Sequence, residues 1–368
     1  MTTTAGPRSA HPFHMWDGIR AIPDALRAEP AWLAEAEAAA GAMLTRPAVD
    51  LVGCGTSYFA AIAIAHVVNQ VAGVPARAHN AFEYAAYPPP PSGRGTLVAI
   101  SHTGTTPDVV AAVAAHGDAG PTLALTDAAG SPLAQACDHV LVEPGGLEPA
   151  LTKTRSYATT LRRGYALALA LARRLGRRAS ALERALDRAG EAAAAALAAA
   201  EADDSGAAAR FASAPRVLVI GGGPELATAN EAALKITEAA SVHAVALQVE
   251  EAAHGAWAST RPGELAILLA PAGPTAAHAD RVAHGMRTLG AHTWMLTNRA
   301  APPAEVDALT RLPDLDEPLM PLVSVIPLQV FAYRLALARG LDPDTMGTDD
   351  PRRSQARTIM RRSLAARP

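Results

Sequence analysis

The chain has 368 residues, half of which are hydrophobic, and a formal net charge of −3. Its length allows two ordinary domains with full cores, and its charge gives no electrostatic reason to expect a nucleic-acid or membrane partner. The two cysteines, Cys54 and Cys137, are too few for a disulfide framework or a cysteine zinc site. Their scarcity indicates a reduced, cytoplasmic setting.

The N-terminus has no basic region followed by an apolar stretch, so it lacks the features of a signal peptide. Apolar runs such as Ile267–Ala270 have the length of a strand, and we expect none to reach the roughly 18 residues of a membrane span. The sequence therefore predicts a soluble, intracellular chain.

In chain order, helices are expected near Trp16–Leu26 and Ala31–Met43, and strands and helices alternate from Val49 onward. The expected strands are Asp50–Gly53, Leu97–Ile100, Thr122–Leu125 and His139–Val142. The expected helices after Val49 are Tyr58–Val71, Asp108–Ala115, Pro132–Ala136, Ser156–Leu175 and an alanine-rich segment to Ala202. This alternation predicts an α/β fold with a parallel sheet that has helices on both faces.

The second half of the chain repeats the first. Val52–Gly55 matches Ile220–Gly223 at an offset of 168, which also places Leu97–Ile100 on Leu265–Leu268. Such a register over more than forty residues indicates duplication. The predicted organisation is an N-terminal helical segment (1–45), a first domain with its connecting helix (46–200), a second domain (201–340) and a C-terminal tail (341–368).

Two turns of the first domain have the composition of a phosphate site. The first is Gly53-Cys54-Gly55-Thr56-Ser57, and the second is Ser101–Thr106, which follows the next predicted strand of the core. Backbone N–H groups and hydroxyls at the carboxyl ends of neighbouring parallel strands suit an anion, although serine and threonine there could equally cap helices. The second domain has Gly223-Pro224-Glu225 and Leu269-Ala270-Pro271 instead, so we expect one phosphate site per chain.

Nucleotide cofactors are not expected. The chain has no Gly-x4-Gly-Lys-Ser/Thr segment. Neither glycine turn completes Gly-x-Gly-x-x-Gly, because Tyr58 and Leu226 occupy the sixth position. We expect no cofactor and no metal site.

The two turns resemble the phosphate-binding signatures of sugar isomerase (SIS) domains. The resemblance covers about 49–341 and is strongest to the isomerase half of glucosamine-6-phosphate synthase. It implies two tandem SIS domains, each a flavodoxin-like three-layer sandwich, with substrate contacts from a set of residues in the first domain: Gly55, Thr56, Ser57, Ser101, His102, Thr103 and Thr106. The usual Ser-Gln-Ser-Gly reads Ser-His-Thr-Gly here, so His102 could change the charge near the phosphate.

A charged face on the helix around 230–238 supplies acid–base candidates. Glu231, Lys235 and Glu238 are spaced i, i+4 and i+7, so they share one face. A solvated face with an ion pair is the simpler interpretation, but the helix is otherwise apolar and follows the second glycine turn. The family's Ala-Leu-Lys-x-x-Glu and Glu-x-x-His-Gly motifs match 233–238 and 251–255.

This resemblance implies roles for four residues. Glu238 would move the proton between C1 and C2 of the sugar with help from Lys235, and His254 would act on the ring oxygen from a neighbouring subunit. Glu251 would contact the substrate or orient groups around it. The resemblance therefore implies a homodimer with shared active sites.

Two further segments resemble the family in part. Glu148 begins a stretch that resembles the one closing over the sugar, although a purely structural role for Glu148 is equally compatible with the sequence. In the tail, the lysine that forms a Schiff base in the synthase is replaced by Ala356, or by Arg357 after a shift of one residue, and arginine does not form Schiff bases. No glutaminase domain is expected before Met15.

We expect the chain to be a phosphosugar aldose–ketose isomerase that acts on amino- or keto-hexose phosphates. The reaction could also include the addition or release of ammonia. One alternative is a deglycase that cleaves sugar-phosphate–amino acid conjugates, and another is a non-catalytic sugar-phosphate-binding protein.

Overall fold

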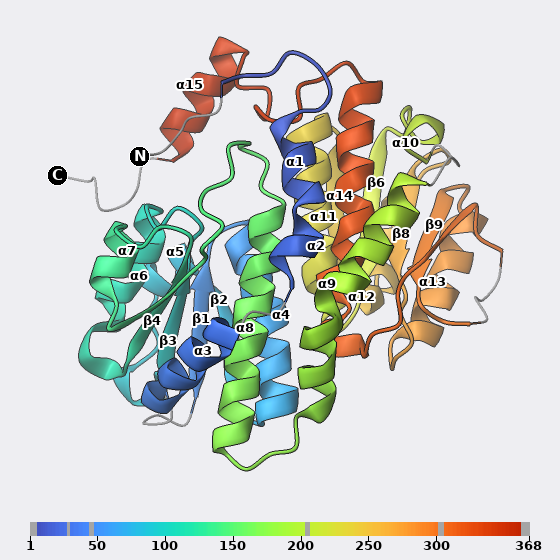
Figure 1. Cartoon of the computed structure of the whole chain (residues 1–368). Coiled ribbons are helices and arrows are strands. Elements are labelled where there is room, and N and C mark those ends of the chain that lie inside the picture. Colours follow the sequence, from blue (N-terminus) through green and yellow to red (C-terminus); the bar gives the residue numbers. More distant parts are fainter. Residues whose placement is uncertain (1–5, 28–29, 44–47, 203–206, 301–304, 362–368) are drawn as a thin grey trace. The chain divides into compact units, whose positions relative to one another are not determined.

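The computed structural model describes residues 6–27, 30–43, 48–202, 207–300 and 305–361. The chain divides into two compact units, each with its own sheet (Figure 1). The first-sheet unit comprises Ala25–Glu148, Arg155–Arg188 and Arg352–Pro368, and the second-sheet unit comprises Met1–Asp24, Pro149–Thr154 and Ala189–Pro351.

The first-sheet unit has five parallel strands in the order β2-β1-β3-β4-β5. They are β1 (Val49–Gly53), β2 (Ala76–Asn80), β3 (Thr96–Ile100), β4 (Thr122–Thr126) and β5 (His139–Val142). The central strands β1, β3 and β4 are buried along their whole length, as expected for strands that have helices on both faces.

Helices cover both faces of this sheet (Figure 1). One face carries α3 (Pro30–Met43), α4 (Thr56–Val67) with η1 (Val68–Ala72), and α8 (Arg155–Arg174). The other carries α5 (Ala81–Ala86), α6 (Pro107–His116) and α7 (Pro132–Ala136), with η2 (Pro91–Gly93) and η3 (Gly117–Ala119) in the connections. Val52, Leu97 and Ala99 pack against Tyr84 and Val109 in the core on this second face.

The second-sheet unit repeats the arrangement. Its parallel strands lie in the order β10-β9-β8-β6-β7. They are β6 (Arg216–Gly221), β7 (His243–Gln248), β8 (Leu265–Leu269), β9 (His292–Thr297) and β10 (Ala308–Arg311). On one face lie α10 (Ala207–Arg210), α11 (Glu225–Ala240) and α14 (Pro321–Ala338), and on the other α12 (Val249–Ala253) and α13 (Ala276–Thr288).

One further long helix is α9 (Ser180–Glu201). The shorter remaining elements are α1 (His14–Arg20), α2 (Ile22–Ala25), α15 (Pro351–Met360), η4 (Ala256–Ser259) and η5 (Glu317–Leu319). The expected fold class, two parallel α/β sandwiches of flavodoxin-like strand order, is confirmed.

The internal repeat is confirmed, with one correction to its register. Gly53 pairs with Asn80, and Gly221 pairs with Gln248, so the offset of 168 holds for the first two strands. At the third strand the offset becomes 169, because Val49 pairs with Thr96 whereas Val217 pairs with Leu265. The second copy therefore carries one extra residue before β8.

We expected no apolar segment long enough to span a membrane, and judged by helix length and composition alone this expectation is wrong. Among the described residues one helix, α14, meets both criteria. It is weak evidence for a membrane span, because a core helix passes the same test and 83% of its apolar window is buried inside the structure. In the second-sheet unit α14 packs against α11.

Candidate functional site

The turn after β1 brings backbone N–H groups to the carboxyl edge of the sheet. Gly55 has a φ of 54°, which a residue with a side chain rarely adopts. A Cβ at Gly53 would lie 2.6 Å from the carbonyl carbon of Ser57, so the backbone approaches itself too closely for any other residue. The chain thus passes sharply from β1 into α4, and Thr56 and Ser57 form the positive end of that helix.

The turn after β3 is held by its own hydroxyls. Ser101 Oγ lies 3.1 Å from Thr106 Oγ1 and accepts the backbone N–H of Gly104, also at 3.1 Å. Thr103 Oγ1 lies 2.8 Å from Thr105 Oγ1. These bonds curl the segment 101–106 into a compact turn before α6 begins at Pro107.

Helix capping does not account for these hydroxyls. Thr106 is the N-cap of α6, but its side chain makes no capping bond and lies against Ser101 instead. Thr56 follows the N-cap of α4, which is Gly55. Since β1 and β3 are neighbours, both turns lie at one edge of the sheet, where they could bind a small anion such as a phosphate group.

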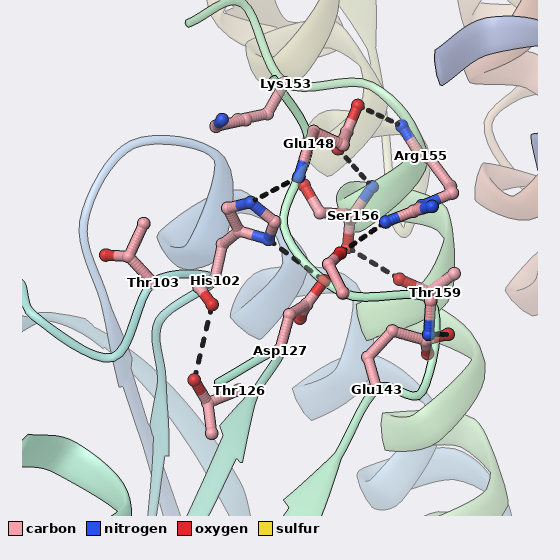
Figure 2. A network of polar contacts seen from close by, with 12 residues as sticks. His102, Thr103, Thr126, Asp127, Glu143, Glu148, Lys153, Arg155, Ser156 and Thr159 are labelled. Carbon is pink, nitrogen blue, oxygen red and sulfur yellow. Dashed lines mark hydrogen bonds and ion pairs between the residues drawn. The ribbon is translucent and has the colours of Figure 1, made fainter. Parts of the chain in front are cut away.

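Behind the second turn, His102 lies between two segments of the same unit. Figure 2 shows its imidazole between the main chain of Glu148 and the carboxylate of Asp127. The backbone N–H of Glu148 donates to Nε2 at 3.2 Å. Nδ1 lies 3.0 Å from Asp127 Oδ2. The two atoms are in close contact but do not meet the geometry of a hydrogen bond. The side chain of His102 therefore faces protein groups at both nitrogens.

The carboxylate of Asp127 also has a cationic partner. Arg163 of α8 donates to Asp127 Oδ1 at 3.0 Å and to the carbonyls of Thr126 and Leu141, both at 2.9 Å. Its Nε lies 3.6 Å from Glu143 Oε2. Burial raises the pKa of the Glu143 carboxyl, and the charge of Arg163 offsets part of that effect. A buried group of alternating charges thus lies beneath the turn.

Glu148 caps the start of α8. Its carboxylate accepts the backbone N–H of Ser156 at 2.7 Å and that of Arg155 at 3.2 Å, and the Arg155 side chain donates to the carbonyl of Gly146 (Figure 2). The structure thus gives Glu148 a structural task, the alternative that the sequence left open.

The charged face of α11 lies inside the second-sheet unit. The side chain of Lys235 is 1% exposed, and its Nζ lies 2.5 Å from Glu238 Oε2 and 3.5 Å from Glu231 Oε1. Glu238 keeps a small exposed area of 14%. The interpretation as a solvated surface face is therefore wrong, because a buried ammonium links the two carboxylates.

The structure places His254 and Glu251 apart from this pair. The His254 side chain is 69% exposed and bonds Glu250 Oε1 at 2.8 Å. Glu251 is exposed in the first turn of α12, where its N–H donates to Gln248. Both residues thus bond neighbours in their own segment, Glu250 and Gln248.

The second glycine turn holds a buried carboxyl group. Glu225 stands at the position of Ser57 in the repeat and is 1% exposed, and Ser324 donates to its Oε2 at 2.9 Å. Burial raises the pKa of Glu225 to about 7, while Thr228 and Ser324 act in the opposite direction. Nearby, Glu317 approaches Gly273 so closely that a Cβ there would lie 2.4 Å from its Cδ.

Several of these residues were missed in the sequence. Asp127 directly follows β4, and Arg163 is one of two consecutive buried arginines in α8, so each carried a local signal. Glu225 could have been found as the acidic replacement for Ser57 at the same repeat position. None of these signals says which residues would be partners.

A model of the SIS domain matches residues 45–170 and 210–339. The chain belongs to the SIS domain family. One similar protein is the glutamine–fructose-6-phosphate aminotransferase (isomerizing) of Pyrobaculum aerophilum, 29% identical over 346 residues, which are 92% of this chain and 56% of that protein. The chain thus spans about half the length of the curated relatives it matches.

Solved structures share the fold. The C-terminal domain of glucosamine-fructose-6-phosphate aminotransferase from Francisella tularensis superposes with a TM-score of 0.83 at 19% identity, over 92% of this chain and all of that one. Tagatose-6-phosphate ketose/aldose isomerase from Escherichia coli gives 0.75 at 19% identity, over 94% and 98%. At such identities the likeness establishes the fold.

Proposed function

We propose that the chain is a phosphosugar aldose–ketose isomerase, which moves a proton between C1 and C2 of a hexose phosphate. The observation that carries this proposal is the Lys235–Glu238 pair on the buried face of α11. The carboxylate of Glu238 lies 2.5 Å from the ammonium group of Lys235 and is only 14% exposed, and a largely desolvated carboxylate is suited to removing a proton next to a carbonyl.

The remaining roles follow from charge and hydrogen-bonding capacity. The N–H groups at Gly55–Ser57 and the hydroxyls of Ser101, Thr103 and Thr106 would bind the phosphate. His254 would act on the ring oxygen in a neighbouring copy of the chain, and Glu251 would contact the substrate or orient groups around it. The exposure of His254 and of Glu251 supports this part, because both side chains are accessible to a second copy. We therefore propose a homodimer with shared active sites.

The second domain is not proposed to bind phosphate. Its glycine turn has lost the hydroxyls, and the carboxyl groups of Glu225 and Glu317 lie at that turn. These carboxyl groups would repel an anionic ligand when they are ionised, which for Glu225 is above its raised pKa of about 7. One phosphate per chain is thus expected in equilibrium binding.

Fructose 6-phosphate is the first substrate to test, because it appears in the names of the relatives. The experiment is solvent-deuterium incorporation at C1 or C2, followed by NMR in D2O, with unphosphorylated fructose as the matched control. Incorporation into the phosphate ester alone would support the proposal. A parallel incubation with ammonium, assayed for glucosamine 6-phosphate, tests amination. Absence of exchange with fructose, tagatose and glucosamine 6-phosphates would contradict the isomerase proposal.

Deglycation is the second candidate. It requires a base and an acid but no Schiff-base lysine, which agrees with Ala356 and Arg357 in the tail. Release of free amino acid from a 6-phosphofructose–amino acid conjugate, without exchange on fructose 6-phosphate, would favour it over isomerisation.

A further inference from the structure

We propose that His102 is a positioning residue, which as a neutral imidazole ties the phosphate turn 101–106 to Glu148 and through it to the start of α8. The inference rests on the proposed function only for the nature of the substrate, because all of the contacts that carry it lie within the first-sheet unit.

The contacts fix the position of the imidazole proton. A backbone N–H can donate only to a ring nitrogen that carries no hydrogen, so the N–H of Glu148 at 3.2 Å requires an unprotonated Nε2 on His102. The proton is therefore on Nδ1, 3.0 Å from Asp127 Oδ2. A fully protonated ring would place N–H against N–H at Glu148. The structure thus assigns the Nδ1–H tautomer to His102.

The charged groups around the ring are paired with one another. Arg163 donates to the second oxygen of the Asp127 carboxylate, Oδ1, at 3.0 Å. The other charged group at Arg163 is Glu143, at 3.6 Å, and the carboxylate of Glu148 is turned to the N–H groups of Arg155 and Ser156. Hence the Asp127 carboxylate lies beside the ring while its charge is balanced by Arg163.

The turn itself holds His102 by its backbone. The carbonyl of His102 accepts the N–H of Asp127 at 3.0 Å and the hydroxyl of Thr126 at 3.3 Å. The neighbouring Ser101 is fixed by Gly104 and Thr106. With both its carbonyl and its ring engaged, His102 has little freedom to move independently of the turn.

The result is a continuous connection from the phosphate turn to α8. His102 accepts the N–H of Glu148, and the carboxylate of Glu148 accepts the first N–H groups of α8. Loss of the imidazole would leave the Glu148 amide without this acceptor. We expect an anion bound at the turn to rigidify 101–106 and, through His102, the segment around Glu148.

Residue-resolved amide exchange of the full chain tests the connection, in buffer alone and with inorganic phosphate. The Glu148 amide should exchange roughly five to ten times faster in His102→Ala than in the wild type, which is the usual effect of losing one hydrogen bond. In His102→Gln the side-chain carbonyl can accept the same N–H, so protection should largely return. His139→Ala, an exposed histidine of the same unit, is the matched control.

Nitrogen NMR of the wild-type imidazole gives an independent readout that a merely space-filling role would not produce. The expected signal is the neutral Nδ1–H tautomer. An Nε2–H tautomer, or equal exchange of the Glu148 amide in wild type and His102→Ala, would overturn the proposal. If His102→Ala does not fold, the tautomer and the comparison with His102→Gln decide. Neither readout needs turnover, so absence of isomerase activity alongside both expected results would count against the proposed function only.

Discussion

Lys235 and Glu238 form an ion pair one helical turn apart, with Nζ and Oε2 2.5 Å from each other and the lysine side chain 1% exposed. Desolvating an ammonium costs several kcal/mol, which this contact and the one to Glu231 at 3.5 Å offset. Glu238, at 14% exposure, keeps the only exposed edge of the three side chains. It is therefore the carboxylate of this group best placed to meet a substrate.

Replacing Glu238 by Gln should abolish proton exchange. The amide keeps the shape of the carboxylate but cannot accept a proton at neutral pH, so we expect kcat to fall by about a hundredfold or more while substrate still binds. Deuterium incorporation at C1 or C2 of fructose 6-phosphate measures the effect. Exchange that persists at the wild-type rate would mean that another residue is the base.

The hydroxyls after β3 should contribute to phosphate affinity. Ser101→Ala combined with Thr103→Ala removes hydrogen bonds to a charged group, worth about 1.5–3 kcal/mol each, so the affinity for fructose 6-phosphate should drop at least tenfold. Calorimetric titration would measure it, with Thr288→Ala on α13 as the control. An unchanged dissociation constant in the double variant would place the phosphate elsewhere.

The strands that the sequence did not reveal are β2, β7 and β10, and all three lie at sheet edges. None is a continuous apolar run, because polar residues such as Arg77, His243 and Thr310 interrupt them. By contrast β1, β3 and β4 are buried on both faces and are apolar enough to be recognised. An apolar run in the sequence therefore indicates that a strand is buried, and strands that are not buried lack this signal.

The site was predictable where chemistry is local and not where it depends on tertiary contacts. The glycine turns and the spacing of Lys235 and Glu238 are properties of short segments, so they could be identified directly from the sequence. Asp127 and Arg163 are 36 residues apart and meet only because α8 packs on β4. The engagement of His102 by Glu148, 46 residues away, could not be inferred from either residue alone.

The buried Glu225 should make stability depend on pH. Its pKa is raised from 4.5 to about 7, so the folded state holds a proton that the unfolded state releases, and the free energy of unfolding should fall as pH rises between these values. This difference in pKa between the unfolded and folded states corresponds to a loss of roughly 3 kcal/mol of folding stability. Glu225→Gln should flatten this dependence and raise the midpoint of urea unfolding at pH 8. The exposed Glu191→Gln is the control, and a pH profile that Glu225→Gln leaves unaltered would contradict the assignment.

Subunit mixing tests whether His254 acts across a dimer. The His254 side chain is 69% exposed and bonds Glu250, so within the described chain it forms no hydrogen bond or ion pair with Glu238, the proposed base. Glu238→Gln and His254→Ala should each be inactive alone. When the two are unfolded together and refolded, about half of the dimers are mixed, and in each mixed dimer one shared site combines an intact Glu238 with an intact His254. We therefore expect up to roughly a quarter of the wild-type exchange rate to return.

Refolding each variant separately before mixing is the control and should restore less activity, because mixed dimers then form only if subunits exchange. No recovery in the co-refolded sample, or full activity of a monomer at low concentration in gel filtration, would show that each chain completes its own site.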